Sequence, residues 1–177
     1  LDAWFIKSTA KKDEMVSLNK TINWKPAATG EGRFGNWLEN MVDWNLSRSR
    51  YWGTPLPIWA NEDGEQICIG SIEELKEAIQ NAINAGIMPA DSNIENLVKD
   101  LHRPYVDNII LVSETGKALY REPDLIDVWF DSGAMPFAQW HFPFENVELF
   151  AKNYPANFIA EGVDQTRGWF YTLHALG

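Results

Sequence analysis

Residues 161–169, EGVDQTRGW, hold the side chains of this chain best suited to binding a nucleotide or an amino acid. A carboxylate such as Glu161, where a strand ends, can accept hydrogen bonds from ribose hydroxyls. Gly162 lets a ligand approach the backbone closely. Asp164 can bind the same ligand, although capping the following helix is the commoner role of an aspartate in this place.

The same stretch and an earlier one offer candidate pocket walls. Gln165 and Trp169 lie four residues apart and share a helix face, so an amide and an indole can line one small pocket. On spacing alone, a Trp169 in the core beside an exposed Gln165 fits equally well. In residues 127–133, DVWFDSG, polar and apolar residues alternate, which predicts a strand ending at a glycine turn. Trp129 within it fits the core or a pocket.

Other motifs do not indicate a site. Residues 30–35, GEGRFG, match the dinucleotide-binding fingerprint, but residues 25–29 are no buried strand, so a flexible loop is the better interpretation. The histidines have no partner at metal-ligand spacing, so we expect packing or surface roles for His102, His141 and His174. No base lies near Ser47 or Ser132 that would make either a nucleophile.

The candidate residues need a strand and a helix to position them. Residues 157–160 after Pro155 predict a short strand, 161–164 a turn, and 165–176 a helix. Such a strand-turn-helix unit belongs to an open α/β sheet, which binds ligands at the carboxyl ends of its strands.

The first part of the chain predicts further elements. Residues 4–6 predict a strand, and a helix begins within 11–15. A proline-containing loop follows, and then a second helix with Asn36 as its cap. The apolar residues assigned to one face of this second helix are Trp37, Leu38, Met41 and Trp44.

Residues 57–122 predict a small insertion of two hairpins and a helical pair. The first hairpin turns at Asp63-Gly64 and the second at Thr115-Gly116. Two capping boxes begin at Ser71 and Ser92, each with a glutamate three residues later. Gly86 predicts the end of the first helix.

Composition sets limits on function. The chain has 177 residues, 45% of them hydrophobic, and no apolar run of the roughly 20 residues that a membrane helix needs. The start has neither a methionine nor an export signal, so we expect it to lie inside a longer protein. One cysteine excludes an intrachain disulfide and fits a cytoplasmic setting. A net charge of −10 makes the chain alone a poor nucleic-acid binder. The nine tryptophans fit packing, or else a glycan-binding surface.

Several strings together resemble the isoleucyl-tRNA synthetase family of class I enzymes. They keep the order of that family and span nearly the whole chain: RFGNWLEN at 33–40, DWNLSRSRYWGTP at 43–55, DLHRPY at 100–105, LIDVWFDSG at 125–133 and EGVDQTRGWF at 161–170. The Ser-Arg and Trp-Gly elements are shared with sibling enzymes. The last two strings favour isoleucine over valine or leucine.

The resemblance implies roles for individual residues. Positions matching Glu161, Gly162 and Asp164 hold the ribose side of the adenylate in the family. Those matching Trp129, Gln165 and Trp169 line the isoleucine pocket.

The family reaction joins isoleucine to ATP with Mg²⁺ and then passes the isoleucyl group to tRNA(Ile). The His-Ile-Gly-His and Lys-Met-Ser-Lys-Ser signatures of the family are not in this chain, so we expect no catalytic residue here and an inactive fragment. Editing, needed because one methylene separates isoleucine from valine (a problem for which this family is the standard example), belongs to a domain outside this chain.

The expected fold is α/β, the second half of a split Rossmann-like nucleotide-binding fold with a small α+β connective insertion. Residues 1–56 and 123–177 would form the synthetase body and 57–122 the insertion. Many relatives carry a zinc-binding Cys-x-x-Cys where this chain has residues 60–65, ANEDGE, so we predict no zinc. Arg48 and Arg50 fit either a surface for the tRNA acceptor end or structural ion pairs.

Three alternatives remain open. One is a sibling enzyme specific for valine or leucine, with a differently shaped pocket. Another is a non-catalytic paralogue that serves as an interaction module. The third is the glycan-binding module.

Overall fold

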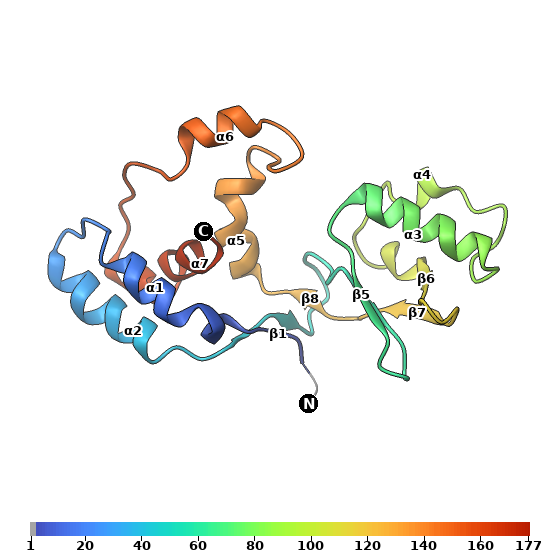
Figure 1. Ribbon diagram of the computed structural model, residues 1–177, viewed down its shortest axis with the longest axis horizontal. Helices are drawn as coiled ribbons and strands as arrows, with labels where there is room; N and C mark the ends of the chain where they lie inside the picture. Colours follow the sequence, from blue (N-terminus) through green and yellow to red (C-terminus); the bar gives the residue numbers. More distant parts are fainter. Residues whose placement is uncertain (1–2) are drawn as a thin grey trace. The chain divides into compact units, whose positions relative to one another are not determined.

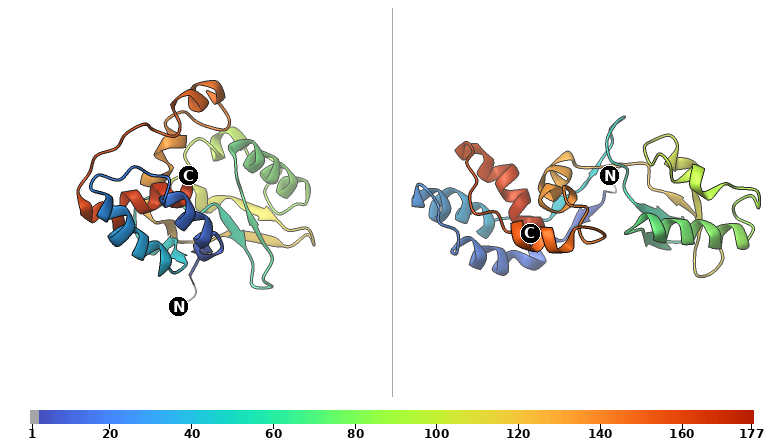
Figure 2. Two further views of the ribbon diagram at one scale, coloured as in Figure 1. Left: turned by 60° about the vertical axis from the view of Figure 1, so that its left-hand side comes forward. Right: turned by 90° about the horizontal axis from the view of Figure 1, so that it is seen from above.

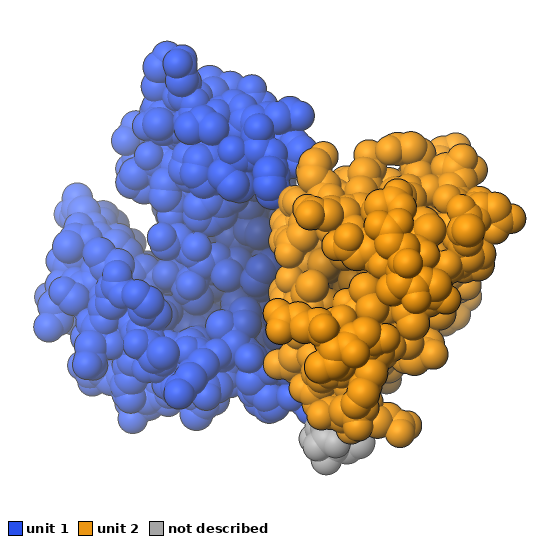
Figure 3. Space-filling view, turned by 45° about the vertical axis from the view of Figure 1, so that its right-hand side comes forward, with its two compact units in different colours: residues 1–46, 127–177 blue, residues 47–126 orange. Residues whose placement is uncertain are grey.

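The structure is a computed structural model that describes residues 3–177. Residues 1 and 2, with which the predicted segment 1–56 begins, lie outside the described residues. The chain divides into two compact units, one of residues 1–46 with 127–177 and one of residues 47–126, coloured separately in Figure 3. Their assignment as synthetase body and connective insertion stays a prediction.

The first unit is mainly helical (Figure 1). The strands β1 and β2 pair antiparallel, and β1 confirms the strand predicted at residues 4–6. In chain order its elements are β1 (Phe5–Ile6), η1 (Ser8–Lys11), α1 (Lys12–Asn19), η2 (Thr29–Phe34), α2 (Gly35–Glu39), β2 (Trp44–Asn45), α5 (Val128–Ala138), α6 (Val147–Asn153), η4 (Val163–Arg167) and α7 (Trp169–Leu176).

The glycine-rich stretch 30–35 is helical, and the loop interpretation is wrong. Residues 29–34 form a wide turn of π type that runs directly into α2. Asn36 therefore lies inside the helix and does not cap it. The helix ends at Glu39, so Trp44 is not on its face but in strand β2. The buried core formed here consists of Met15, Phe34, Leu38 and Met41.

Residues 128–138 form helix α5, and the predicted strand at 127–133 is wrong. The Asp127 side chain caps the helix by accepting a hydrogen bond from the Trp129 N–H at 3.2 Å. Gly133 is not a turn residue. It is buried where α5 packs on α7, and a β-carbon there would lie 2.9 Å from the Thr172 carbonyl carbon. The contact of α5 with α7 is visible in Figures 1 and 2.

Residues 157–160 do not form the predicted strand. They are irregular and exposed, and they pair with no other strand among residues 3–177. A strand needs a neighbour to satisfy its backbone N–H and C=O groups, and the described part of the chain supplies none. The predicted helix at 165–176 is present in two pieces, η4 and α7, which meet at Gly168.

The second unit contains a four-stranded antiparallel sheet with the order β5-β4-β7-β6. A short pair, β3 with β8, is also antiparallel. In chain order its elements are β3 (Ser47–Arg48), β4 (Ile58–Ala60), β5 (Gln66–Cys68), α3 (Ile72–Asn84), α4 (Ile94–Leu97), η3 (Val106–Asn108), β6 (Ile110–Val112), β7 (Ala118–Arg121) and β8 (Leu125–Ile126).

Local signals in the second unit are mostly confirmed. Both hairpins form, with Gly64 and Gly116 at positive φ in their turns. The Ser71 hydroxyl caps α3 by accepting from the Glu74 N–H at 3.0 Å. The cap of α4, however, is Asn93 and not Ser92. Helix α3 packs on the sheet around Trp59, Ile79, Ile109 and Leu111, which are all but fully buried.

The fold is thus a mixture of helices and β-strands. All strand pairs among residues 3–177 are antiparallel. The half of a split Rossmann-like fold that we expected has parallel strands, and that finer assignment stays a proposal.

Candidate functional site

The candidate pocket residues meet where α5 packs on the start of α7. Gly168 marks this place, because a β-carbon on it would lie 2.8 Å from Gln165 Oε1 and 3.4 Å from Trp129 Cη2. The Trp169 N–H donates to Gln165 Oε1 at 2.9 Å, so the Gln165 amide satisfies the first N–H of α7. We call Trp129, Ser132, Gln165, Gly168 and Trp169 the α5–α7 site.

Both indoles of the α5–α7 site have defined environments. The Trp169 indole N–H donates to the Ser132 carbonyl oxygen at 3.0 Å, and its ring is half-buried. Trp129 lies on the first turn of α5 and is 41% exposed. An indole anchored through its N–H beside a second, accessible one offers an apolar wall that an aliphatic side chain can pack against.

The residues predicted for the ribose side lie just before η4. Glu161 and Gly162 are exposed in the extended segment that precedes it. Asp164 does not cap a helix, since Gly162 occupies that position and no side-chain cap bond forms. Its Oδ2 accepts from Gln165 Nε2 at 3.0 Å. A β-carbon at Gly162 would lie only 2.5 Å from Asp164 Oδ1, so glycine leaves room for the carboxylate in this position.

Polar bonds between the Gln165 amide, Asp164 and Trp169 therefore join two groups of predicted residues. Gln165 donates to Asp164 and accepts from Trp169 with the same amide group. This fixes the orientation of the amide, because its oxygen and nitrogen each have one assigned partner. The Ser132 and Trp169 bond connects α5 to the same network. Glu161, in the described structure, does not hydrogen-bond to any of these residues.

Sequence reasoning missed two supports of the site. Asp127, only 5% exposed, accepts from the Trp44 indole N–H at 2.9 Å and so ties the start of α5 to β2. Thr166, fully buried, accepts from Arg33 Nε at 3.0 Å. An aspartate directly before an apolar helix was a readable cap signal. Nothing in the sequence predicted the contact between Arg33 and Thr166, which lie far apart along the chain.

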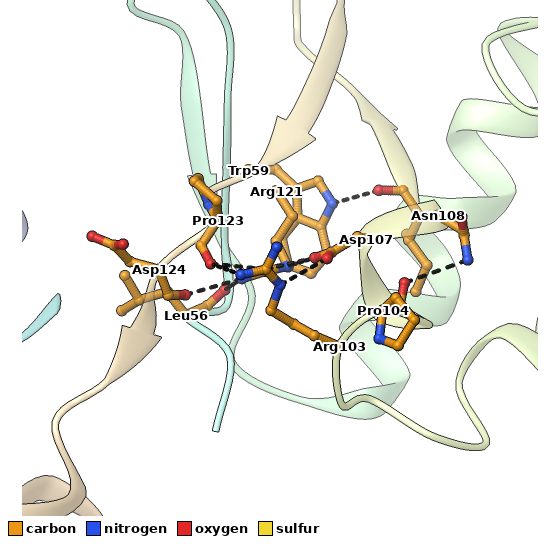
Figure 4. Close-up of polar contacts among 10 residues, drawn as sticks. Leu56, Trp59, Arg103, Pro104, Asp107, Asn108, Arg121, Pro123 and Asp124 are labelled. Atoms are coloured by element: carbon orange, nitrogen blue, oxygen red, sulfur yellow. Dashed lines mark hydrogen bonds and ion pairs between the residues drawn. The ribbon is translucent and has the colours of Figure 1, made fainter. Parts of the chain in front are cut away.

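The densest polar network of the second unit surrounds Arg121 (Figure 4). The Arg121 side chain has no exposed surface, and its Nε donates to Asp107 Oδ1 at 2.7 Å. Its Nη1 donates to the Leu56 and Asp124 carbonyl oxygens at 3.4 and 3.2 Å. Arg103 also donates to Asp107, at 2.9 Å. These contacts use the guanidinium fully, which indicates a structural role.

The Arg121 network also determines the ionisation of Asp107. Partial burial raises the pKa of its carboxyl, but hydrogen bonds and charges from Arg103 and Arg121 outweigh that effect. The net pKa is lowered from its ordinary value. Asp107 is therefore held as a carboxylate.

The remaining candidate residues have ordinary surroundings. His102 stacks on Trp52 with ring centres 4.7 Å apart and contacts Asp100, whereas His174 contacts the Met15 carbonyl oxygen. His141 lies exposed, 3.4 Å from Glu145.

Neither arginine of the Ser-Arg element is assigned a tRNA contact. Arg48 donates to the Ser47 carbonyl oxygen at 2.9 Å, and Arg50 is exposed. Ser47 is buried. A surface for the tRNA acceptor end and structural ion pairs therefore both stay predictions for these arginines.

In residues 3–177, no three side chains of His, Cys, Asp or Glu come together as a metal site. The absence of zinc stays a prediction. No helix in the described part of the chain is both long and apolar enough to cross a membrane.

Comparisons with known proteins identify relatives along the whole chain. The family described as tRNA synthetases class I (I, L, M and V) matches residues 1–177. The chain is 74% identical to an isoleucine–tRNA ligase of Cytophaga hutchinsonii over 177 residues, covering 99% of this chain and 16% of that protein. It is 64% identical to the isoleucine–tRNA ligase of Bacteroides fragilis over 191 aligned residues, covering 99% of this chain and 17% of the relative. The enzyme of Clostridium tetani is 52% identical, with 99% and 16% covered. The chain thus spans about a sixth of the length of these relatives.

Proposed function

The chain belongs to the class I tRNA synthetase family, and we propose that, within a longer isoleucine–tRNA ligase, it forms part of the isoleucyl-adenylate pocket. The substrates would be isoleucine, ATP and tRNA(Ile), and the setting the cytoplasm. The observation that carries the proposal is the meeting of Trp129, Gln165 and Trp169 at Gly168. The similarity to isoleucine enzymes, at 52–74% identity, favours this specificity over valine or leucine.

In this proposal the two indoles contact the isoleucine side chain. Trp169 is held by its bond to Ser132, so its ring can present a fixed apolar face. A rigid wall loses little entropy when a ligand binds, and it discriminates by shape. Trp129, which is partly exposed, would be covered by the ligand.

The ribose of the adenylate would contact Glu161, Gly162 and Asp164. The Glu161 carboxylate is exposed and can accept from ribose hydroxyls, whereas Gly162 leaves room for the ligand beside the backbone. Asp164 already shares a bond with Gln165, so adenylate and amino-acid groups would be bound by one connected network.

The family uses ATP together with Mg²⁺, and the described residues form no cluster of three possible metal ligands. Because Mg²⁺ is usually held by one or two carboxylates together with substrate phosphates, no complete site is assigned to this part of the chain and no step is assigned to the ion. None of the six proposed residues is catalytic. They bind and orient, which brings the carboxylate of isoleucine towards the α-phosphate of ATP.

The test is isoleucine-dependent ATP–pyrophosphate exchange by the full-length protein that carries this chain, with isoleucine, valine and leucine compared. We expect the highest kcat/KM with isoleucine. Glu161→Ala and Trp169→Ala should each lower it by about tenfold to a hundredfold, the effect of losing one hydrogen bond to a charged group or one well-packed ring. Glu148→Ala, an exposed glutamate on α6, is the matched control.

Two results would contradict the proposal. No exchange with any of the three amino acids in a well-folded protein would favour the non-catalytic paralogue. Highest kcat/KM with valine or leucine would favour a sibling enzyme.

The isolated chain is expected to be inactive and to bind an isoleucyl-adenylate analogue weakly or not at all. The proposed pocket has residues on one wall only in this part of the protein, and Glu161 and Trp129 are exposed. Micromolar affinity in a calorimetric titration of the 177-residue chain would contradict this expectation.

A further inference from the structure

Thr166 is the one residue between Asp164 and Trp169 with no exposed surface. Its hydroxyl donates to the Val163 carbonyl oxygen at 2.7 Å, which closes the turn of η4. The same oxygen accepts from Arg33 Nε at 3.0 Å. A side chain from the helix η2 therefore fixes the middle of the turn that carries Gln165.

The helix that supplies Arg33 is itself held in place. Asn19, only 6% exposed, donates to the Gly30 carbonyl oxygen at 3.0 Å and accepts from the Trp24 indole N–H at 2.8 Å. A β-carbon at Gly30 would lie 2.0 Å from the Trp24 ring, so only glycine permits this approach. The helix η2 is thus anchored to α1 through the Gly30 carbonyl, which also accepts from the Gly35 N–H.

The bond between Arg33 and Thr166 would act on the site through Gln165, the residue directly before Thr166 in η4. Gln165 is joined directly to Thr166, and its Oε1 accepts the Trp169 N–H at 2.9 Å. A side-chain amide reaches this N–H only if the turn keeps its conformation. Loss of the Thr166 hydroxyl would free the Val163 carbonyl and leave Arg33 Nε without its partner.

We propose that Arg33 and Thr166 are positioning residues: they hold the η4 turn so that Gln165 and Trp169 face the isoleucine of the proposed function, on which this inference rests. Neither residue touches the ligand in this proposal. Their effect passes through the backbone of η4 to the Gln165 amide. Part of the stretch that resembles a dinucleotide fingerprint thereby has a purpose other than binding phosphate.

The first experiment does not depend on activity. Hydrogen exchange of the Trp169 amide is measured in the full-length protein that carries this chain, for Thr166→Val and Thr166→Ser. Valine has nearly the same shape but no hydroxyl, whereas serine keeps the hydroxyl. We expect protection of the Trp169 amide to fall about tenfold with valine, the effect of one lost hydrogen bond, and to stay within about twofold with serine. Equal protection in both variants would overturn the proposal.

The second experiment separates positioning from general stability. In pyrophosphate exchange, Thr166→Val and Arg33→Lys should each raise KM for isoleucine about tenfold. Thr166→Ser should leave it unchanged. The double variant Arg33→Lys with Thr166→Val should be no worse than either single one, because both remove the same contact. Additive effects, or a lower Tm with unchanged KM, would overturn the proposal. If the unmodified protein shows no isoleucine-dependent pyrophosphate exchange, the proposed function fails. Hydrogen exchange of the Trp169 amide still decides whether Arg33 and Thr166 hold the η4 turn.

Discussion

The two units of the chain differ in how completely they bury their own apolar side chains. In the second unit a helix covers the four-stranded sheet, and most of the fully buried apolar residues among residues 3–177 lie there. The first unit has a smaller core around Phe34 and Leu38. It also exposes a series of large apolar side chains from α5 onward: Val128, Trp129, Met135, Phe144, Val147, Leu149, Phe158, Ile159 and Val163.

The two units therefore differ in how far their own residues supply the strand partners and packing that they need. In residues 47–126 every strand has at least one antiparallel partner, and the predicted cap at Ser71 is formed. Residues 157–162 instead form an exposed irregular segment without a strand partner in the described part of the chain. The residues proposed to bind ligand are in the less complete unit. This fits a chain that spans about a sixth of the length of its relatives.

The largest effect is expected from breaking the Arg121 network of the second unit. Arg121→Met removes a buried guanidinium and leaves the Leu56 carbonyl without its donor, whereas the Asp124 carbonyl keeps the Leu56 N–H. We expect the free energy of unfolding of this unit to fall by about 3 kcal/mol. Denaturant titration, followed by hydrogen exchange of the β6 and β7 amides, measures it. Arg103→Met, which removes a partly exposed partner, is the control and should cost under about 1 kcal/mol. Equal losses would mean that burial of Arg121 is unimportant.

A smaller effect is expected at the helix contact of the first unit. Gly133→Val inserts atoms where a β-carbon already meets the Thr172 backbone at 2.9 Å. Overpacking of this kind costs about 1–3 kcal/mol, and we expect a loss of unfolding free energy in that range. Gly32→Ala, where a β-carbon would meet nothing within 4 Å, should be neutral or slightly stabilising. A destabilised Gly32→Ala variant would contradict this.

The caps of the second unit sharpen the comparison further. Ser71→Ala removes the acceptor for the Glu74 N–H and should cost about 1 kcal/mol in a thermal or chemical unfolding curve. Ser92→Ala should change stability by less than about 0.5 kcal/mol, since Asn93 caps α4. A larger loss of stability with Ser92→Ala than with Ser71→Ala would instead support the capping box that the sequence predicted at Ser92.

The smallest effect is a pH dependence carried by Asp107. Its pKa in the folded chain is below the ordinary value of about 3.9 that it regains on unfolding. Its contribution to stability is therefore complete above that value, and is lost as the pH falls from there towards the lowered folded pKa. Acid titration of stability should be steeper in that window for the unmodified chain than for Asp107→Asn. Identical slopes would show that Asp107 contributes nothing.

Local signals were readable from the sequence where a few neighbouring residues determine the structure. The turns at Gly64 and Gly116 and the cap at Ser71 are of this kind. The prediction failed at residues 127–133 because a short apolar run fits two periods, and the cap by Asp127 decided for the helix. It failed at 157–160 because β-propensity cannot provide a pairing strand.

The candidate site was predictable only as residue types. The family resemblance selected Trp129, Gln165 and Trp169, and their convergence at Gly168 became visible in three dimensions. The Arg33 contact with Thr166 depends on tertiary packing, for which a sequence pattern has no local signal.

Gly133 has one more consequence, for motion. At this contact the Thr172 backbone and the side chains of Thr172 and Leu176 occupy the space that a β-carbon of Gly133 would need, so α5 and α7 are closely packed there. A displacement of α7 relative to α5 at this position would have to move the Thr172 and Leu176 atoms that pack against Gly133.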